Sequence, residues 1–190
     1  RKGQCMNTQM MAAYARGRKC LDVGCGRDKI PGSTGIDIAV ASEADIRHDL
    51  GVFPYPVESD AYDAIFCRNV IEHVPNVVKL MEEIHRAGRH GAEVFITTPH
   101  FSSVYSYQDP THVRHLSYES LDYFTTDTRH SNFYTDRRFE MAERAVDFGK
   151  SFPFSFIAKG LFALSARRYE KHFAFMFPAN SLFFRLRVVK

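Results

Sequence analysis

The sequence has no marked excess of charge of either sign and no long apolar run. Its 25 basic and 22 acidic side chains leave a formal net charge of +3 over 190 residues, too little to indicate a nucleic-acid-binding protein. No apolar run reaches the roughly 18 residues that a transmembrane helix needs, and no secretory signal sequence is visible. A chain of this length is expected to form a single domain, residues 1–190.

Cysteine is scarce and shows no pairing motif. It occurs at Cys5, Cys20, Cys25 and Cys67, without any Cys-x-x-Cys spacing. This pattern is typical of reduced thiols in the cytoplasm rather than of a disulfide framework, so a cytoplasmic location is expected. The histidines and acids are ligand types that could bind a metal, but no spacing singles out a metal site, and none is predicted.

Two phosphate-binding motifs are incomplete in the stretch that contains the first glycines. A dinucleotide fingerprint needs Gly-x-Gly-x-x-Gly, but Lys29 stands at its third glycine position, and the Gly-Lys-Ser/Thr of a phosphate-binding loop is absent. Instead, a short apolar strand pattern at 20–23 runs into Gly24-Cys25-Gly26, and a second one ends at Asp37. Parallel sheets bind ligands over the carboxyl ends of their strands, where an acid can accept both ribose hydroxyls. The stretch therefore predicts a site for a nucleoside-type cofactor.

Asp-x-Gly-x-Gly at 22–26, followed by Gly-Ile-Asp at 35–37, resembles the class I S-adenosylmethionine-dependent methyltransferases. The resemblance implies a Rossmann-like α/β fold, a doubly wound, mostly parallel seven-stranded sheet with an antiparallel last strand. It also implies S-adenosylmethionine as cofactor, with the glycine turn facing its methionyl part. The cofactor-binding residues that it implies are Asp22, Gly24, Cys25, Gly26, Asp37, Ile38, Asp49, Leu50 and Asn69. The alternative is a glycine pair that only makes a tight turn.

The rest of the chain fits this fold. Helical patterns cover 8–14 and 77–86, whereas Pro31-Gly32 excludes a helix between the first two strands. Short helical crossovers are expected to join the later strands. Further strands are predicted at 45–50, 62–67, 93–98, 139–148 and 181–190.

The loop 99–117 is expected to lie over the cofactor cleft, because it leaves the fifth strand at its carboxyl end. Pro-His at 99–100, then Asp-Pro-Thr-His-x-Arg at 109–114, resembles a bacterial subgroup of these methyltransferases that often accompanies genes for surface-saccharide synthesis. His100 and His112 are candidate general bases, with Asp109 orienting one of them, because imidazole titrates near the working pH. The alternative is a structural turn whose side chains bond the backbone. For His73, near the same cleft, two interpretations stay open: the anchor of a helix start, which is favoured, and a group that moves protons.

The segment 151–180 is an insertion dense in phenylalanine, with Lys159, Arg167, Arg168 and Lys171 against the single acid Glu170. Such a segment could lie on a membrane surface, bind a lipid-linked acceptor, cover the acceptor pocket or form a dimer contact. Simple packing against its own domain is an equally open interpretation.

The sequence therefore predicts an S-adenosylmethionine-dependent methyltransferase that O-methylates a small-molecule, saccharide or lipid-linked acceptor. One alternative is a non-catalytic cofactor-binding subunit of a larger assembly. Another is a nucleic-acid methyltransferase. The latter is disfavoured because no basic domain is appended, and because 68–71 read Arg-Asn-Val-Ile where many amino-methylating enzymes have Asp/Asn-Pro-Pro-Tyr.

Overall fold

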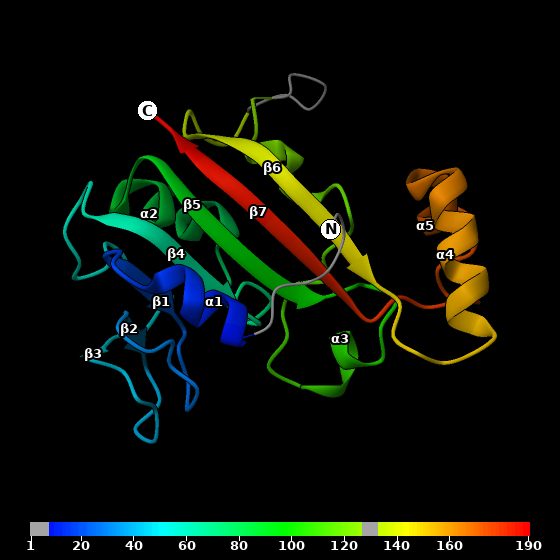
Figure 1. The fold of residues 1–190 in the computed structure, drawn as a ribbon, viewed down its shortest axis with the longest axis horizontal. Helices are drawn as coiled ribbons and strands as arrows, with labels where there is room; N and C mark the ends of the chain where they lie inside the picture. Colours follow the sequence, from blue (N-terminus) through cyan, green and yellow to red (C-terminus); the bar gives the residue numbers. More distant parts are fainter. Residues whose placement is uncertain (1–7, 127–132) are drawn as a thin grey trace.

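The computed structural model describes residues 8–126 and 133–190, so Cys5 lies outside the described residues. These residues form one seven-stranded sheet with helices on both faces (Figure 1). The strands are β1 (Cys20–Val23), β2 (Thr34–Asp37), β3 (Ile46–Arg47), β4 (Tyr62–Arg68), β5 (Gly88–Pro99), β6 (Arg138–Asp147) and β7 (Ser181–Val189). The helices are α1 (Thr8–Ala15), α2 (Val77–Ala87), α3 (Tyr105–Gln108), the 3-10 helix η1 (Ser120–Phe124), α4 (Phe154–Leu164) and α5 (Ala166–His172).

The strand order confirms the predicted fold. It runs β3-β2-β1-β4-β5-β7-β6, with β1 to β5 mutually parallel and β7 antiparallel to both β5 and β6. The order reverses between β1 and β4, and a doubly wound sheet binds its ligand at such a reversal. The strand predicted at 45–50 is shorter than expected, because only Ile46 and Arg47 pair with β2.

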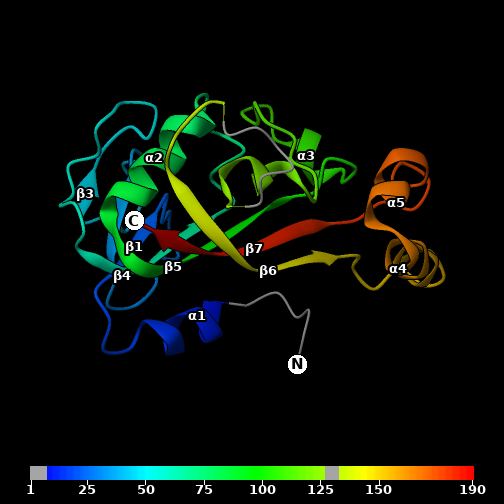
Figure 2. The same ribbon diagram turned by 90° about the horizontal axis from the view of Figure 1, so that it is seen from above.

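The expected helical crossovers are largely absent, which corrects that part of the prediction. Within the described residues, loops alone connect β1 to β2, β2 to β3 and β3 to β4. Gly51, Pro54 and Pro56 interrupt the last of these loops, and such residues do not continue a helix. Figure 2 shows the resulting arrangement, in which α1 lies on one face of the sheet and α2 and α3 lie on the other.

Apolar side chains hold both faces of the sheet. The larger cluster includes Leu80 and Ile84 of α2, which pack with Val94 and Leu186 of the sheet. Asn76 caps α2 by accepting a hydrogen bond from the backbone of residue 79 at 3.0 Å. A smaller cluster lies under α1 and consists of Met11, Ala15, Cys20, Ile30, Ala64, Phe66, Phe95, Ala145 and Phe183. The sheet is therefore fixed from both sides at β1, β4 and β5, the strands that carry the site.

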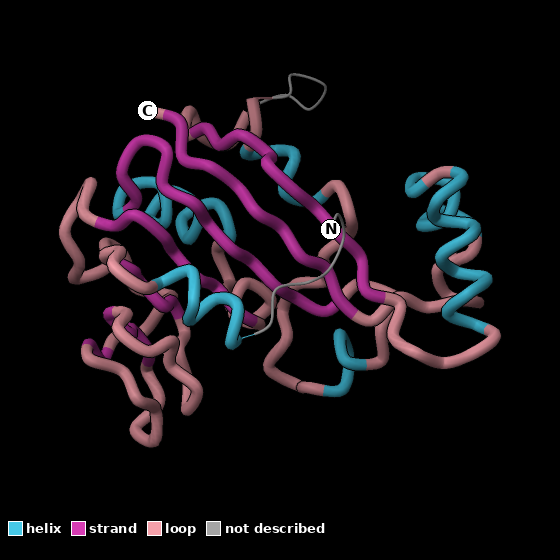
Figure 3. The backbone as a smooth tube through the Cα atoms, in the orientation of Figure 1, coloured by secondary structure: helices cyan, strands magenta, loops and turns pink. Residues whose placement is uncertain are grey.

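Helices α4 and α5 follow β6 and precede β7 in the sequence. They form a hairpin beside the sheet (Figures 1 and 3). The hairpin has its own small core of Phe148, Ala158, Tyr169, Ala174 and Ala179. Glu170 of α5 fastens it to the main body by accepting the Tyr118 N–H at 2.6 Å and by meeting His100 Nε2 at 3.0 Å. None of the helices in the described residues has the length and hydrophobicity needed to cross a bilayer.

Candidate active site

The chain turns sharply after β1 at Gly24 and Gly26, which have φ angles of 65° and 55°. Such left-handed conformations favour glycine because it has no Cβ. The Gly24 N–H donates to the Ile36 carbonyl at 2.8 Å. Asp37 accepts the Gly26 N–H at 2.9 Å through Oδ2 and the Ala39 N–H at 2.7 Å through Oδ1. Asp37 therefore clamps the glycine turn to the end of β2.

A cavity of about 510 Å³ lies over the ends of β1, β2 and β4, and we call it the glycine cavity. Its volume is typical of small-molecule sites. It combines the carboxylates of Asp37 and Asp49 with the apolar side chains of Ile38, Leu50 and Val70. Its full lining is Gly24, Asp37, Ile38, Ala39, Asp49, Leu50, Gly51, Asn69, Val70, His73, Val74, Pro75 and Thr111.

A second cavity, of about 960 Å³, lies beside the loop 99–117, and we call it the histidine cavity. It is lined by Asn69, Glu72, His73, Thr97, Pro99, Tyr105, Gln108, Asp109, Pro110, His112, Asp147, Asn180 and Ser181. The two cavities share Asn69 and His73. Asn69 adopts a φ of 52° at this junction, a conformation that asparagine tolerates better than most residues. The molecule therefore offers two adjoining compartments.

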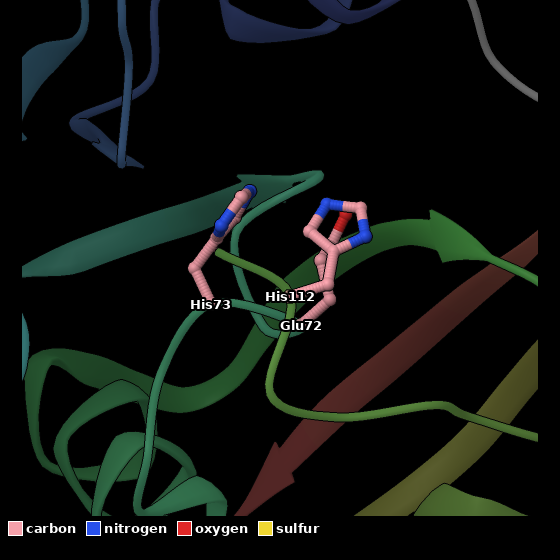
Figure 4. Close-up of side chains that lie close together, drawn as sticks. All are labelled: Glu72, His73 and His112. Atoms are coloured by element: carbon pink, nitrogen blue, oxygen red, sulfur yellow. The ribbon is translucent and has the colours of Figure 1, made fainter. Parts of the chain in front are cut away.

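Three reactive side chains meet beside the junction: Glu72, His73 and His112 (Figure 4). Their ligand-type atoms lie within 4.8 Å of one another, and the two imidazole centroids are 4.5 Å apart. The backbone N–H groups of Val113 and Arg114 donate to the Glu72 carbonyl, at 2.9 and 3.1 Å, and bring the loop to the end of β4. Burial raises the pKa of Glu72, and burial together with the neighbouring His112 lowers the pKa of His73.

The sequence matches a family model described as a methyltransferase domain over residues 6–149. The chain belongs to this methyltransferase family. Its fold is similar to that of an S-adenosylmethionine-dependent methyltransferase from Archaeoglobus fulgidus, with 17% identity, coverage of 95% of this chain and 94% of that chain, and a TM-score of 0.56. A Mesorhizobium loti methyltransferase has 13% identity, 95% and 98% coverage and a TM-score of 0.59. The cyclase SpnF has 16% identity, 99% and 86% coverage and a TM-score of 0.59. No curated protein matches the sequence significantly.

S-adenosylmethionine is the cofactor of this methyltransferase, and the composition of the glycine cavity suits it. The cofactor presents ribose hydroxyls and an exocyclic amine to hydrogen-bond acceptors, and an adenine ring to apolar side chains. A Cβ added at Gly26 would meet no atom within 4 Å, so the turn leaves open space beside its backbone. Of the residues predicted to bind the cofactor, those that line the glycine cavity are Gly24, Asp37, Ile38, Asp49, Leu50 and Asn69.

Asp22 and Cys25 have other surroundings than predicted. Asp22 is completely buried, and its Oδ2 accepts the Ile30 N–H and an Arg68 N–H, both at 2.9 Å. Burial raises the pKa of Asp22, and Arg68 offsets part of this rise. Cys25 is buried with its sulfur against Gly35, and burial raises the pKa of its thiol to about 11. Among the described residues, neither side chain belongs to the lining of the glycine cavity, and both are buried beside the glycine turn.

The predicted catalytic residues divide into two groups. His112 and Asp109 line the histidine cavity. His100 is fully buried: its Nδ1 meets Ser102 Oγ at 2.8 Å and its Nε2 meets Glu170 Oε1 at 3.0 Å. With both ring nitrogens engaged under the hairpin, His100 does not face the cavity. This position corrects the expectation that it meets the acceptor.

The sequence interpretation noted the Glu72-His73 pair but gave Glu72 no role, and for His73 it favoured a helix anchor over proton transfer. The available signal was their position, a Glu-His pair four residues beyond β4, on the side of the sheet where ligands bind. Ile71 and Val74 are buried on either side of the pair. These apolar anchors fix the backbone so that Glu72 and His73 line the histidine cavity.

Proposed function

We propose that this methyltransferase O-methylates a hydroxyl group of a polar acceptor, of the small-molecule or saccharide class, in the histidine cavity. The observation that carries the proposal is the junction at Asn69 and His73, which belong to both cavities. The lining of the histidine cavity is mostly carboxylate, amide, imidazole and hydroxyl side chains, and Tyr105 is its one phenol among the described residues. Such a surface suits a ligand that carries many hydroxyl groups.

On this proposal the glycine cavity holds the cofactor. Asp37 accepts the ribose hydroxyls, and Asp49 accepts the exocyclic amine of adenine. Ile38 and Leu50 cover the faces of the adenine ring, because both are apolar side chains of the same cavity. Asn69 then lies nearest the sulfonium, at the passage to the acceptor.

The cofactor supplies an electrophilic methyl group, which the acceptor oxygen takes as the carbon–sulfur bond breaks with its electron pair left on sulfur. The protein must align the acceptor oxygen, and good alignment can contribute on the order of 7 kcal/mol. It must also promote loss of the hydroxyl proton. The Glu72–His73–His112 cluster is placed for this task because all three side chains line the histidine cavity.

The α4–α5 hairpin supports a lipid-linked form of this acceptor. Asp147, Asn180 and Ser181, at the base of the hairpin, also line the histidine cavity. The hairpin segment exposes the apolar side chains Phe152, Phe154, Phe156, Leu164, Phe175 and Met176. It also exposes the cations Lys159, Arg167, Arg168 and Lys171, while Glu170 is bound inward by His100 and Tyr118. Apolar and cationic side chains together fit an anionic membrane surface.

The test is transfer of a labelled methyl group to a panel of acceptors, with product analysis by NMR. The panel contains free saccharides, a saccharide linked to a lipid in anionic vesicles, RNA, DNA and amine-bearing small molecules. We expect methyl ethers, and more product from the vesicle-bound acceptor than from the same saccharide in solution. Methyl groups found only on nitrogen or on nucleic acid would refute the proposal. A dimer formed through the hairpin without vesicle binding would refute its lipid-linked form.

Variants connect this activity to the site. His112→Ala should lower turnover by about 100-fold, because it removes a group that acts on the hydroxyl. Adenosylhomocysteine affinity should stay close to that of the wild type, since His112 lines the histidine cavity and does not line the glycine cavity. His115→Ala is the matched control: this exposed histidine of the same loop stacks on Tyr107 outside the cavity lining, and turnover should remain near wild type.

A further inference from the structure

We propose that Glu72, His73 and His112 bind one divalent transition-metal cation at the wall of the histidine cavity. Two imidazoles and one carboxylate converge there, with their ligand-type atoms within 4.8 Å of one another (Figure 4). This is the donor set of His2Glu zinc centres and of facial triads that keep open coordination positions. The cation would be a metal of the manganese-to-zinc series.

The first independent observation is a buried carboxylate. Glu72 is 1% exposed, and within the described residues neither of its oxygens has a hydrogen bond of standard geometry. Buried carboxylates are normally paired with a cation or hydrogen-bonded, since burial without a partner is strongly unfavourable. The neighbouring Thr98 hydroxyl is placed to interact with this carboxylate, and it also lacks a hydrogen bond of standard geometry. A cation held by Glu72 would supply a charged partner.

The second observation is the state of the two imidazoles. His112 Nδ1 meets the Ser106 carbonyl at 3.2 Å, so this nitrogen donates, and in a neutral imidazole Nε2 then keeps its lone pair. Thr111 Oγ1 donates its own proton to the Asp109 carboxylate at 2.7 Å and must therefore accept from His73 Nδ1, at 2.9 Å. His73 Nε2 consequently carries a lone pair as well.

These supporting bonds are those of metal-binding histidines. Such histidines donate their second ring nitrogen to a carbonyl or a carboxylate, and the bond fixes the ring and its tautomer. Here the Ser106 carbonyl accepts the hydrogen bond from His112 directly, whereas the Asp109 carboxylate is linked to His73 through the Thr111 hydroxyl. Each imidazole thus keeps one ring nitrogen available to bind a metal, close to the buried Glu72 carboxylate, as a metal site requires.

The consequence for catalysis rests on the proposed function. An acceptor hydroxyl that takes an open coordination position of the cation becomes more acidic, as metal-bound water does. The proton can then leave to solvent in the open cavity, and the oxygen attacks the methyl carbon. In this scheme the three side chains act through the metal, and His112 does not serve as a lone general base.

The test is titration of tag-free protein with Co²⁺, without cofactor or acceptor, followed by calorimetry and visible absorption. We expect about one Co²⁺ per chain, with ligand-field bands. Glu72→Gln keeps the size of the side chain and breaks no hydrogen bond of standard geometry. It should weaken Co²⁺ binding at least ~10-fold, as should His112→Ala. His115→Ala, in the same loop, should bind Co²⁺ like the wild type. Thermal melts of the metal-free variants show that each is folded.

Absence of saturable Co²⁺ binding would overturn the metal site, as would equal affinity in wild type and Glu72→Gln. Methyl transfer measured with and without a chelator separates this inference from the proposed function. If the protein binds no Co²⁺ and still forms methyl ethers in the presence of a chelator, the proposed metal site is refuted and the proposed O-methyltransferase function stands. Saturable binding with no ether product from any acceptor would refute the proposed function alone.

Discussion

Asp37 gives the sharpest test of the cofactor site, because one of its oxygens holds the glycine turn and the other holds the backbone just after β2. Oδ2 accepts the Gly26 N–H at 2.9 Å and Oδ1 accepts the Ala39 N–H at 2.7 Å. A carboxylate has about four acceptor positions, so both oxygens can still accept a ribose hydroxyl. Asp37→Ala removes the clamp and the ribose acceptor together. The variant should therefore lose both some folding stability and most of its affinity for the cofactor.

The expected loss of affinity follows from these bonds. A hydrogen bond to a charged group contributes roughly 1.5–3 kcal/mol, and about 1.4 kcal/mol corresponds to a factor of ten. Loss of one ribose bond should raise the Kd for adenosylhomocysteine by roughly 10- to 150-fold. Isothermal titration calorimetry at a temperature where the variant is fully folded measures this directly.

Asp45 provides the matched control. It too accepts a glycine N–H of this region, from Gly35 at 2.7 Å, and it pairs with Lys29 at 2.8 Å. It does not line the glycine cavity in the described chain. Asp45→Ala should therefore lower the unfolding temperature and leave the Kd nearly unchanged. Undiminished binding by Asp37→Ala, or an equal loss in Asp45→Ala, would refute the assignment of Asp37 to the ribose.

Three further predictions concern the supporting structure. Gly24→Ala should greatly weaken cofactor binding in calorimetry, because its Cβ would lie 2.2 Å from Val70 Cγ2 and displace the cavity wall; wild-type affinity would contradict this. Arg68→Met should lower the free energy of unfolding in urea by about 3 kcal/mol or more, because Asp22 is left buried without its cation. An added Asp22→Asn should recover part of that loss, and no recovery would argue against the pair. Burial lowers the pKa of His85 below its ordinary value of 6.5. As the pH falls from 7 to 5, the unfolded chain therefore binds a proton at this side chain more readily than the folded chain does, and the free energy of unfolding should decrease. A slope unchanged in His85→Gln would exclude this source.

Local patterns were sufficient for the sheet and the glycine turn. The strand before Gly24 and the acid at Asp37 are encoded within 18 consecutive residues, 20–37, so no distant partner is needed to recognise them. The alternation of β7 was equally informative. Leu186 and Val188 are fully buried, whereas Arg185 and Arg187 turn to the other face and pair with Glu93. Such periodicity follows from the pleat of the strand itself.

The site residues depended on partners that lie far away in the sequence. Asp22 has the position of a cofactor ligand, but Arg68, 46 residues later, holds it inward. His100 has the position of a base, but Glu170, 70 residues later, engages its Nε2. A sequence pattern gives the side chain and its strand end, and it does not show which distant charge the packed fold brings there. For that reason the strand-end acids and histidines could be recognised, but not their orientation.

The same distant bonds explain why the loop 99–117 can serve as one wall of a precise site. At its start, His100 is tied to Glu170 of the hairpin. Near its end, the backbone of Val113 is bonded to the Glu72 carbonyl beyond β4. A loop fixed at both ends loses little conformational freedom on binding, so its polar side chains can be held in position for an acceptor. The hairpin and the end of β4 therefore together determine where His112 stands, although neither lies near it in the sequence.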